Sequence, residues 1–196
     1  RLSYRTFTEF EPIIVEVRSS DGHIGWGEGH ISPGSSSETR DGGWAFCREF
    51  AQEVVGRDTR EAKSAIAAAM AASKVAATAL LTAIEMLAQS SALAPPSTRT
   101  LVPMVGILQA THREGIEKEI KYFIRSGYAI IKVKVGFDVE PDLLRVRLAQ
   151  EALEGTTLLR LDANQGYDLA QAKRFVQNLD SHGIEFFEQP LPEGEW

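Results

Sequence analysis

The sequence contains the run Ile130-Ile131-Lys132-Val133-Lys134-Val135, short and rich in β-branched residues. With Ala129 before it, this run predicts a β-strand over 129–135. Successive side chains of a strand point to opposite faces of the sheet. Ile131, Val133 and Val135 therefore share one face, which suits burial under helices, and the other face carries Ile130, Lys132 and Lys134.

Two later runs have the same construction. In the expected strand Thr157–Ala163 one face is apolar, with Leu159, Leu161 and Ala163. The opposite face carries Arg160 and Asp162, and Asn164 just beyond the strand falls on the same side. In the expected strand Ile184–Gln189, Glu188 shares a face with Phe186 and Pro190 follows it. Burying so many charged groups is costly unless they pair or bind a metal, so the pattern favours a functional interior.

Amphipathic helices are expected between these strands, at Thr111–Ser126, Glu140–Leu153 and Leu169–Ser181, with Thr111 as N-cap and Gly127 after the first helix. A strand over Val102–Leu108 precedes them. Alternation of this kind predicts a parallel sheet built from right-handed βα units. The polar residues lie at the carboxyl ends of the strands, where barrel active sites lie, and a closed barrel takes about eight strands. The four expected strands therefore form half of a barrel.

The N-terminal part is built differently. Two strands between Phe7 and Gly27 are expected to form a hairpin that turns at Ser19–Gly22. A loop over Ser32–Gly43 and two helices, Trp44–Val55 and Glu61–Gln89, should follow; the second is alanine-rich, which suits close packing against another helix. Pro95–Thr98 breaks the chain. We therefore expect one domain over 1–95 and a second over 96–196.

Composition narrows the classes of function. The chain has 196 residues, a formal net charge of −6 and no block of basic residues. Nucleic acid and anionic membranes are therefore poor partners. The single cysteine, Cys47, excludes a disulfide within the chain, and no segment reads as a signal peptide or a membrane span. A cytoplasmic location is expected.

The inner-face residues suggest a reaction. Asp162 and Glu188 are hard oxygen ligands on successive strands, the kind that Mg²⁺ prefers. A divalent ion there would hold a substrate carboxylate, and loss of the neighbouring carbon-bound proton would give an enediolate. The metal ion and fixed cations stabilise such negative charge. A lysine could serve as the base if part of it is neutral.

Three motifs in this order resemble the enolase superfamily: Lys132-Val133-Lys134, Asp162-Ala163-Asn164 and Glu188-Gln189-Pro190. The Lys-x-Lys motif is similar to that of the muconate-lactonizing subgroup, in the mandelate racemase/muconate lactonizing enzyme branch. Asp21–Glu28 resembles the hairpin of the family's capping domain, and Ser32–Thr39 falls where the family has a specificity loop. The resemblance implies an α+β capping domain followed by the first half of a (β/α)7β TIM-like barrel.

The resemblance also implies roles. Lys134 would be the base, and Lys132 would assist at the substrate carboxylate and tune Lys134. Asp162 and Glu188 would be the first two ligands of Mg²⁺ or Mn²⁺, with Asn164 and Arg160 in a supporting or substrate-binding layer. The family's third ligand and second catalytic lysine come from later strands, and its opening capping-domain strand would precede Arg1. The chain is therefore expected to be a truncated part of an enzyme and inactive by itself.

The implied activity is that of an isomerase acting on a small carboxylate. The candidate reactions are racemisation or epimerisation of an N-acyl amino acid or dipeptide and cycloisomerisation of the muconate type, which share one proton transfer. The resemblance also implies a homo-oligomer. β-Elimination, as in succinylbenzoate synthesis, and a catalytically silent binding or scaffold relative are alternatives. A third alternative is an unrelated Mg²⁺-dependent barrel lyase. Such an enzyme would not need the N-terminal hairpin, so the hairpin argues against it. Taken singly, each motif fits a solvated edge strand or a turn; the three together favour a site.

Overall fold

A computed structural model of the chain describes residues 8–34, 37–154 and 157–195. These residues form two compact units, one over 8–99 and the other over 100–195. The division falls just after the Pro95–Thr98 break. Assignment of 1–95 and 96–196 to a capping and a barrel domain stays a prediction. Phe7 lies outside the described residues, as do positions 35–36 of the expected specificity loop.

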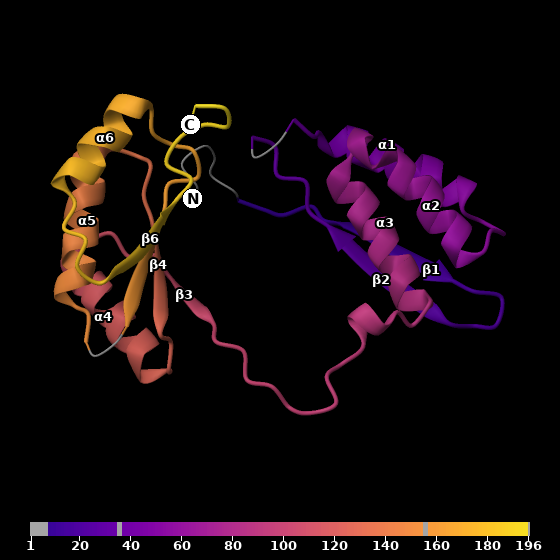
Figure 1. Cartoon of the computed structure of the whole chain (residues 1–196), viewed down its shortest axis with the longest axis horizontal. Helices are drawn as coiled ribbons and strands as arrows, with labels where there is room; N and C mark the ends of the chain where they lie inside the picture. The colour runs from indigo at the N-terminus through magenta and orange to yellow at the C-terminus, as the bar shows by residue number, and fades with distance from the viewer. Residues whose placement is uncertain (1–7, 35–36, 155–156, 196) are drawn as a thin grey trace. The chain divides into compact units, whose positions relative to one another are not determined.

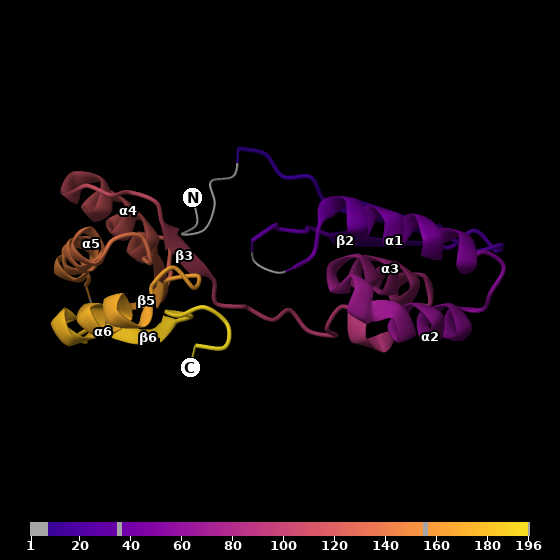
Figure 2. The ribbon, with the colours of Figure 1, turned by 90° about the horizontal axis from the view of Figure 1, so that it is seen from above.

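The first unit is a hairpin covered by helices. Strands β1 (Ile13–Arg18) and β2 (Ile24–Gly29) pair antiparallel, from Ile13 opposite Gly29 to Arg18 opposite Ile24. Three α-helices gather on one side of the hairpin (Figures 1 and 2). They are α1 (Arg40–Glu53), α2 (Thr59–Ala69) and α3 (Lys74–Leu87), with short 3₁₀ turns η1 (Met70–Ala72) and η2 (Ser91–Leu93). The predicted hairpin is confirmed.

Helix α3 packs directly on the backbone of the hairpin. A Cβ atom on Gly27 would lie 1.9 Å from the carbonyl oxygen of Ala79, and one on Gly25 would lie 1.9 Å from that of Ala83. The alanines on this side of α3 are fully buried. The small side chains therefore serve a close helix-to-strand approach, whereas the sequence suggested close packing between helices.

Two predicted helix bounds were wrong. The single helix expected over Glu61–Gln89 is two helices, because Ser73 adopts an extended backbone and its hydroxyl accepts a hydrogen bond from Ala76 N at 3.4 Å, as an N-cap does. Helix α1 begins at Arg40, inside the expected loop, because Thr39 Oγ1 accepts from Gly42 N at 3.1 Å. Alanine-rich sequence has helix propensity throughout, which concealed the break at Ser73.

The second unit is a sheet with one helical layer. Its strands lie parallel in chain order: β3 (Val105–Leu108), β4 (Ile130–Lys134), β5 (Leu158–Asp162) and β6 (Ile184–Glu188). Figures 1 and 2 show the helices side by side along the sheet: α4 (Arg113–Arg125), α5 (Val139–Glu151) and α6 (Leu169–Asn178). The parallel βα arrangement is confirmed.

Local bounds in this unit differ from prediction at two places. Strand β3 starts at Val105 rather than Val102, and Val102 is exposed. The N-cap position of α4 is His112 rather than Thr111, and its side chain makes no capping bond. Gly127 follows α4 with φ +82°, as expected of a residue after a helix end.

The core of the second unit lies between the sheet and its helices. It includes the apolar faces of the two central strands, with Ile131, Val133, Leu159 and Leu161 fully buried against α4, α5 and α6. Burying each such side chain contributes about 1.5–3 kcal/mol. A slip of one residue would bring the lysines into this layer, so the core fixes the register. The predicted alternation of faces is confirmed, and the polar faces point away from the helices.

Candidate active site

Two lysines and two acids meet at the carboxyl edge of the four-stranded sheet. Lys132 Nζ lies 2.6 Å from Asp162 Oδ2 and 2.8 Å from Glu188 Oε2. Lys134 Nζ lies 2.5 Å from Asp162 Oδ2 and donates to Asn164 Oδ1 at 2.6 Å. Lys134 is in register with Asp162, and Asp162 with Glu188, so neighbouring strands bring these side chains together. The structure thus assembles five of the six predicted site residues.

The environment fixes the charges of this cluster. The Asp162 side chain is only 1% exposed, and burial alone would raise its pKa. Hydrogen bonds from Lys132, Lys134 and the Asn164 backbone outweigh burial and hold the pKa of Asp162 below its usual value. Burial likewise pushes the pKa of Lys132 down, but its bonds to Asp162 and Glu188 leave it above the usual value. Lys132 and Asp162 are therefore an ion pair at neutral pH.

The backbone after β5 and β6 is unusual. Asn164, Gln165 and Gln189 have φ of +46°, +63° and +44°, a left-handed conformation that residues other than glycine seldom adopt. Asp162 Oδ1 accepts from Asn164 N at 3.0 Å, and Gln165 N donates to Gln189 O at 2.8 Å. Such conformations persist only where their surroundings enforce them, and they concentrate at functional sites. Here they turn the chain directly beyond Asp162 and Glu188.

Arg160 is engaged elsewhere. Its guanidinium donates to both carboxylate oxygens of Glu185, at 2.6 and 3.3 Å, and lies 4.8 Å from the centre of the Phe186 ring. Alternation along β6 predicts that Glu185 faces away from Glu188, toward the helices; this is wrong, because its partner is Arg160 on the neighbouring strand β5. A register irregularity between β5 and β6, at Leu159 and Arg160, changes the alternation of faces there. A part for Arg160 in substrate binding stays a prediction.

Sequence reasoning missed the residues that support the end of β4. Gly136 has φ +89°, and a Cβ there would lie 2.3 Å from Ala163 O, so glycine is required for the chain after β4 to approach β5. Three buried or half-buried polar residues, Asp142, Arg145 and Tyr167, bond to this region. Charges on the buried side of a helix were the available signal, but the sequence alone does not show what they contact.

The donor chemistry of the cluster suits a hard cation. In the described part of the chain, no group of three or more His, Cys, Asp and Glu side chains converges as a metal site. Two carboxylates, Asp162 and Glu188, do converge, because the ammonium nitrogen of Lys132 is within hydrogen-bonding distance of both. Carboxylate oxygens are the protein ligands that Mg²⁺ prefers, and here the two carboxylates approach the same ammonium group. The metal-binding and catalytic roles of these residues stay predictions.

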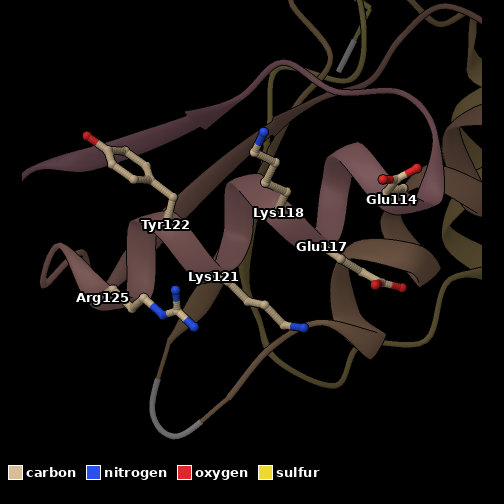
Figure 3. A pocket seen from close by; sticks show the side chains of 6 residues that line it. All are labelled: Glu114, Glu117, Lys118, Lys121, Tyr122 and Arg125. Carbon is tan, nitrogen blue, oxygen red and sulfur yellow. The ribbon is translucent and has the colours of Figure 1, made fainter.

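A surface hollow on α4 has a different character. Two rows of side chains spaced four residues apart line it, and Figure 3 shows them spreading to either side of the helix: Glu114, Lys118 and Tyr122, and Glu117, Lys121 and Arg125. Each row carries a glutamate followed four residues later by a lysine, as on an ordinary solvated helix face. The hollow contains none of the predicted site residues. Among the described helices, none combines the length and apolarity needed to cross a bilayer.

Comparison with known proteins gives one family and a consistent set of relatives. Residues 115–196 match the family described as "Enolase C-terminal domain-like". The chain is 31% identical to L-Lys-D/L-Arg epimerase of Methylococcus capsulatus, over 99% of this chain and 57% of that protein. It is 33% identical to o-succinylbenzoate synthase of Thermosynechococcus vestitus, over 94% of this chain and 54% of the relative. The chain spans about half the length of the curated relatives it matches.

Comparison with solved structures gives relatives of the same kind. The dipeptide epimerase from Methylococcus capsulatus, complexed with Mg and the dipeptide L-Arg-D-Lys, superposes with a TM-score of 0.77 at 29% identity, over 99% of this chain and 57% of that one. N-succinyl Arg/Lys racemase from Bacillus cereus gives a TM-score of 0.84 at 21% identity, over 97% and 55%, which is a likeness of fold. The expected fold class, an α+β unit followed by half of a TIM-like barrel, is confirmed.

Proposed function

We propose, from the premise that this chain belongs to the enolase superfamily, that the protein containing it removes the α-proton of a carboxylate substrate in a metal-dependent isomerisation. The observation that carries the proposal is the convergence of Lys132 and Lys134 on Asp162, with Glu188 alongside, at the carboxyl edge of a parallel sheet. Active sites of barrel enzymes lie at that edge. The arrangement unites a candidate base, a second cation and two oxygen ligands.

Each residue has a proposed task. Lys134 takes the proton from the α-carbon in its neutral form, and Asn164 Oδ1 orients its nitrogen. Lys132 places a positive charge beside the substrate carboxylate. Asp162 and Glu188 hold Mg²⁺ or Mn²⁺, which when bound supplies positive charge for the enediolate oxygens. Related dipeptide epimerase structures complexed with Mg support this metal.

The substrate class we propose is a dipeptide or an N-acylated amino acid, with epimerisation as the outcome. Support comes from relatives described as L-Lys-D/L-Arg epimerase and hydrophobic dipeptide epimerase. β-Elimination is a second candidate, favoured by the 33% identity to an o-succinylbenzoate synthase, and it starts with the same proton removal. Muconate-type cycloisomerisation shares the same proton transfer. The site therefore supports the shared step more strongly than any one product.

Four further proposals concern the chain and the protein that contains it. The resemblance places a third metal ligand and a second catalytic lysine on later strands, so we propose that residues 1–196 alone are inactive. The single buried Cys47 supports a cytoplasmic location. Assembly into a homo-oligomer follows from the resemblance. The proposed partner is the small carboxylate substrate, and binding to nucleic acid or a membrane is not expected.

The test is α-proton exchange into deuterated water by the complete protein with Mg²⁺ and a dipeptide panel, followed by NMR. Lys134→Ala should reduce exchange roughly 10²–10⁴-fold, the range for losing a general base, while Mg²⁺ binding measured by calorimetry persists. Lys173→Ala, which alters an exposed lysine on α6, is the matched control and should exchange at the wild-type rate. Wild-type exchange by Lys134→Ala refutes the proposed base.

A further inference from the structure

Arg145, on the outer helix α5, reaches the ends of two strands. Its Nη1 donates to Lys134 O at 3.0 Å, its Nη2 to Leu108 O at 2.9 Å and its Nε to Ala110 O at 3.1 Å. Leu108 and Lys134 are the last residues of β3 and β4. One guanidinium thus donates hydrogen bonds to three backbone carbonyl groups at or just beyond the carboxyl ends of these strands. Burial lowers the pKa of Arg145, with Asp142 and Glu119 opposing the shift, but a guanidinium stays protonated at neutral pH.

Asp142, one helical turn earlier on α5, holds the other side of the same segment. Its Oδ2 accepts from the backbone N–H groups of Gly136 and Phe137, each at 2.9 Å, and of Asp138 at 3.2 Å. The Asp142 side chain is buried, and these bonds satisfy its charge. The residues directly after Lys134 are therefore fixed from α5 by their N–H groups, while the Lys134 carbonyl is fixed by Arg145.

Tyr167 extends this support to the next two strands. Its hydroxyl donates to Asp142 Oδ2 at 2.6 Å, and its backbone N–H donates to Pro190 O at 3.2 Å. Tyr167 is fully buried and lies in the loop after β5, while Pro190 follows β6. The loops after β4 and β5 are consequently joined through the Asp142 carboxylate, and the loop after β6 is joined to them by the backbone of Tyr167.

We propose that Asp142 and Arg145 are positioning residues for the reaction, holding the carboxyl end of β4 so that the Lys134 nitrogen keeps its place relative to Asp162. This inference rests on the proposed function, in which Lys134 is the base. Lysine has a flexible four-carbon stem, so the position of its nitrogen depends on a backbone that does not move. A misplacement of about 1 Å can cost on the order of 100-fold in rate.

The alternative is that these bonds contribute to stability alone. A stabilising contact would change the midpoint of unfolding and leave turnover of the folded protein untouched. A positioning contact lowers kcat at temperatures where the protein is fully folded, and it leaves KM and metal affinity nearly unchanged because neither residue contacts the carboxylates of the site. The two roles are therefore separable by kinetics.

The experiment compares conservative variants in the complete Mg²⁺-loaded protein. Asp142→Asn, Arg145→Lys and Tyr167→Phe each remove part of the network. Glu140→Gln and Arg147→Lys change exposed residues of the same helix and the same types, as controls. Two readouts are taken below the unfolding transition: kcat and KM for α-proton exchange, and native-state amide hydrogen exchange at residues 136–138.

The expected result for Asp142→Asn is at least tenfold faster amide exchange at 136–138 and a kcat reduced on the order of 10–100-fold, as for loss of supporting contacts around other sites. Arg145→Lys should lower kcat similarly, with KM and Mg²⁺ affinity within about twofold of wild type, and the controls should match wild type. Tyr167→Phe deletes one hydroxyl and keeps the test informative if the other variants fail to fold.

Unchanged kcat in all three folded variants overturns the inference, whether or not amide exchange rises, because the network is then structural alone. Unchanged amide exchange at 136–138 in Asp142→Asn also overturns it. Failure of the proposed function is recognised separately, as wild-type exchange by Lys134→Ala.

Discussion

Lys132 Nζ lies 2.6 Å from Asp162 Oδ2 across the adjacent strands β4 and β5, and Asp162 is almost completely buried. Lys134 approaches the same oxygen atom at 2.5 Å. Asp162 is therefore shared by both lysines, and Glu188 is a second partner of Lys132 alone. Removing one member of such a buried set leaves uncompensated charge, which destabilises more than the set itself stabilises.

Asp162→Asn should therefore lower the free energy of unfolding by about 3 kcal/mol in metal-free buffer, because Lys134 then loses its carboxylate partner and Lys132 keeps only the more exposed Glu188. Urea denaturation in the presence of a chelator measures the loss. Glu185→Gln is the matched control, since it disrupts the more exposed pair with Arg160 and should cost clearly less stability. Equal losses in the two variants would contradict the buried-pair interpretation.

The same pair predicts a dependence of stability on acid. The pKa of Asp162 is lowered in the folded protein, against burial, by its bonds to Lys132 and Lys134. A depressed carboxyl pKa stabilises the fold above the unfolded value of about 3.9, and this contribution is lost as the pH falls through the folded value. The difference in unfolding free energy between wild type and Asp162→Asn should be constant from about pH 5 to 7 and shrink below about pH 4. A difference that does not change with pH would exclude this linkage.

The strand faces were predictable from sequence because alternation in Ile130–Val135 depends on neighbouring residues alone. The apolar set had to enter the core, which left Lys132 and Lys134 on the other face. Parallel pairing then brought these lysines to Asp162, since consecutive βα units align strand ends. Local pattern and a general topological rule were sufficient for this part.

Other features depend on contacts between distant residues. The helix break at Ser73 is set partly by Glu38, whose Oε2 accepts from Ser73 Oγ at 2.7 Å. Because Glu38 lies 35 positions away, the local sequence pattern does not predict this contact. The pairing of Arg160 with Glu185 follows from a register irregularity that alternation cannot anticipate. Asp142 belongs to no recognisable sequence motif, because its partners are backbone N–H groups, which almost every residue has.

The glycines of β2 provide a test of the packing in the first unit. Gly27→Ala should destabilise the fold by about 3 kcal/mol, because its Cβ would lie 1.9 Å from Ala79 O and the α3 backbone would have to move. Gly22→Ala separates this steric effect from backbone conformation. Gly22 has φ +93° and open space around it, so only the conformational cost of about 1 kcal/mol applies. Thermal or urea unfolding compares the two, and a smaller loss for Gly27→Ala than for Gly22→Ala would refute the close approach.

Metal binding tests the remaining acid of the site. Glu188→Gln keeps the shape of the side chain and replaces a charged oxygen ligand with a weaker neutral one. Because Mg²⁺ favours carboxylate oxygens, its affinity in the complete protein should fall by about tenfold or more, at least as much as for loss of an outer contact. Glu185→Gln, three residues earlier and paired with Arg160, is the control and should bind Mg²⁺ as wild type does. Isothermal titration with Mg²⁺ measures both variants. If Glu188→Gln binds as tightly as the control, Glu188 is no ligand, and its bond to Lys132 at 2.8 Å only balances the charge of that lysine.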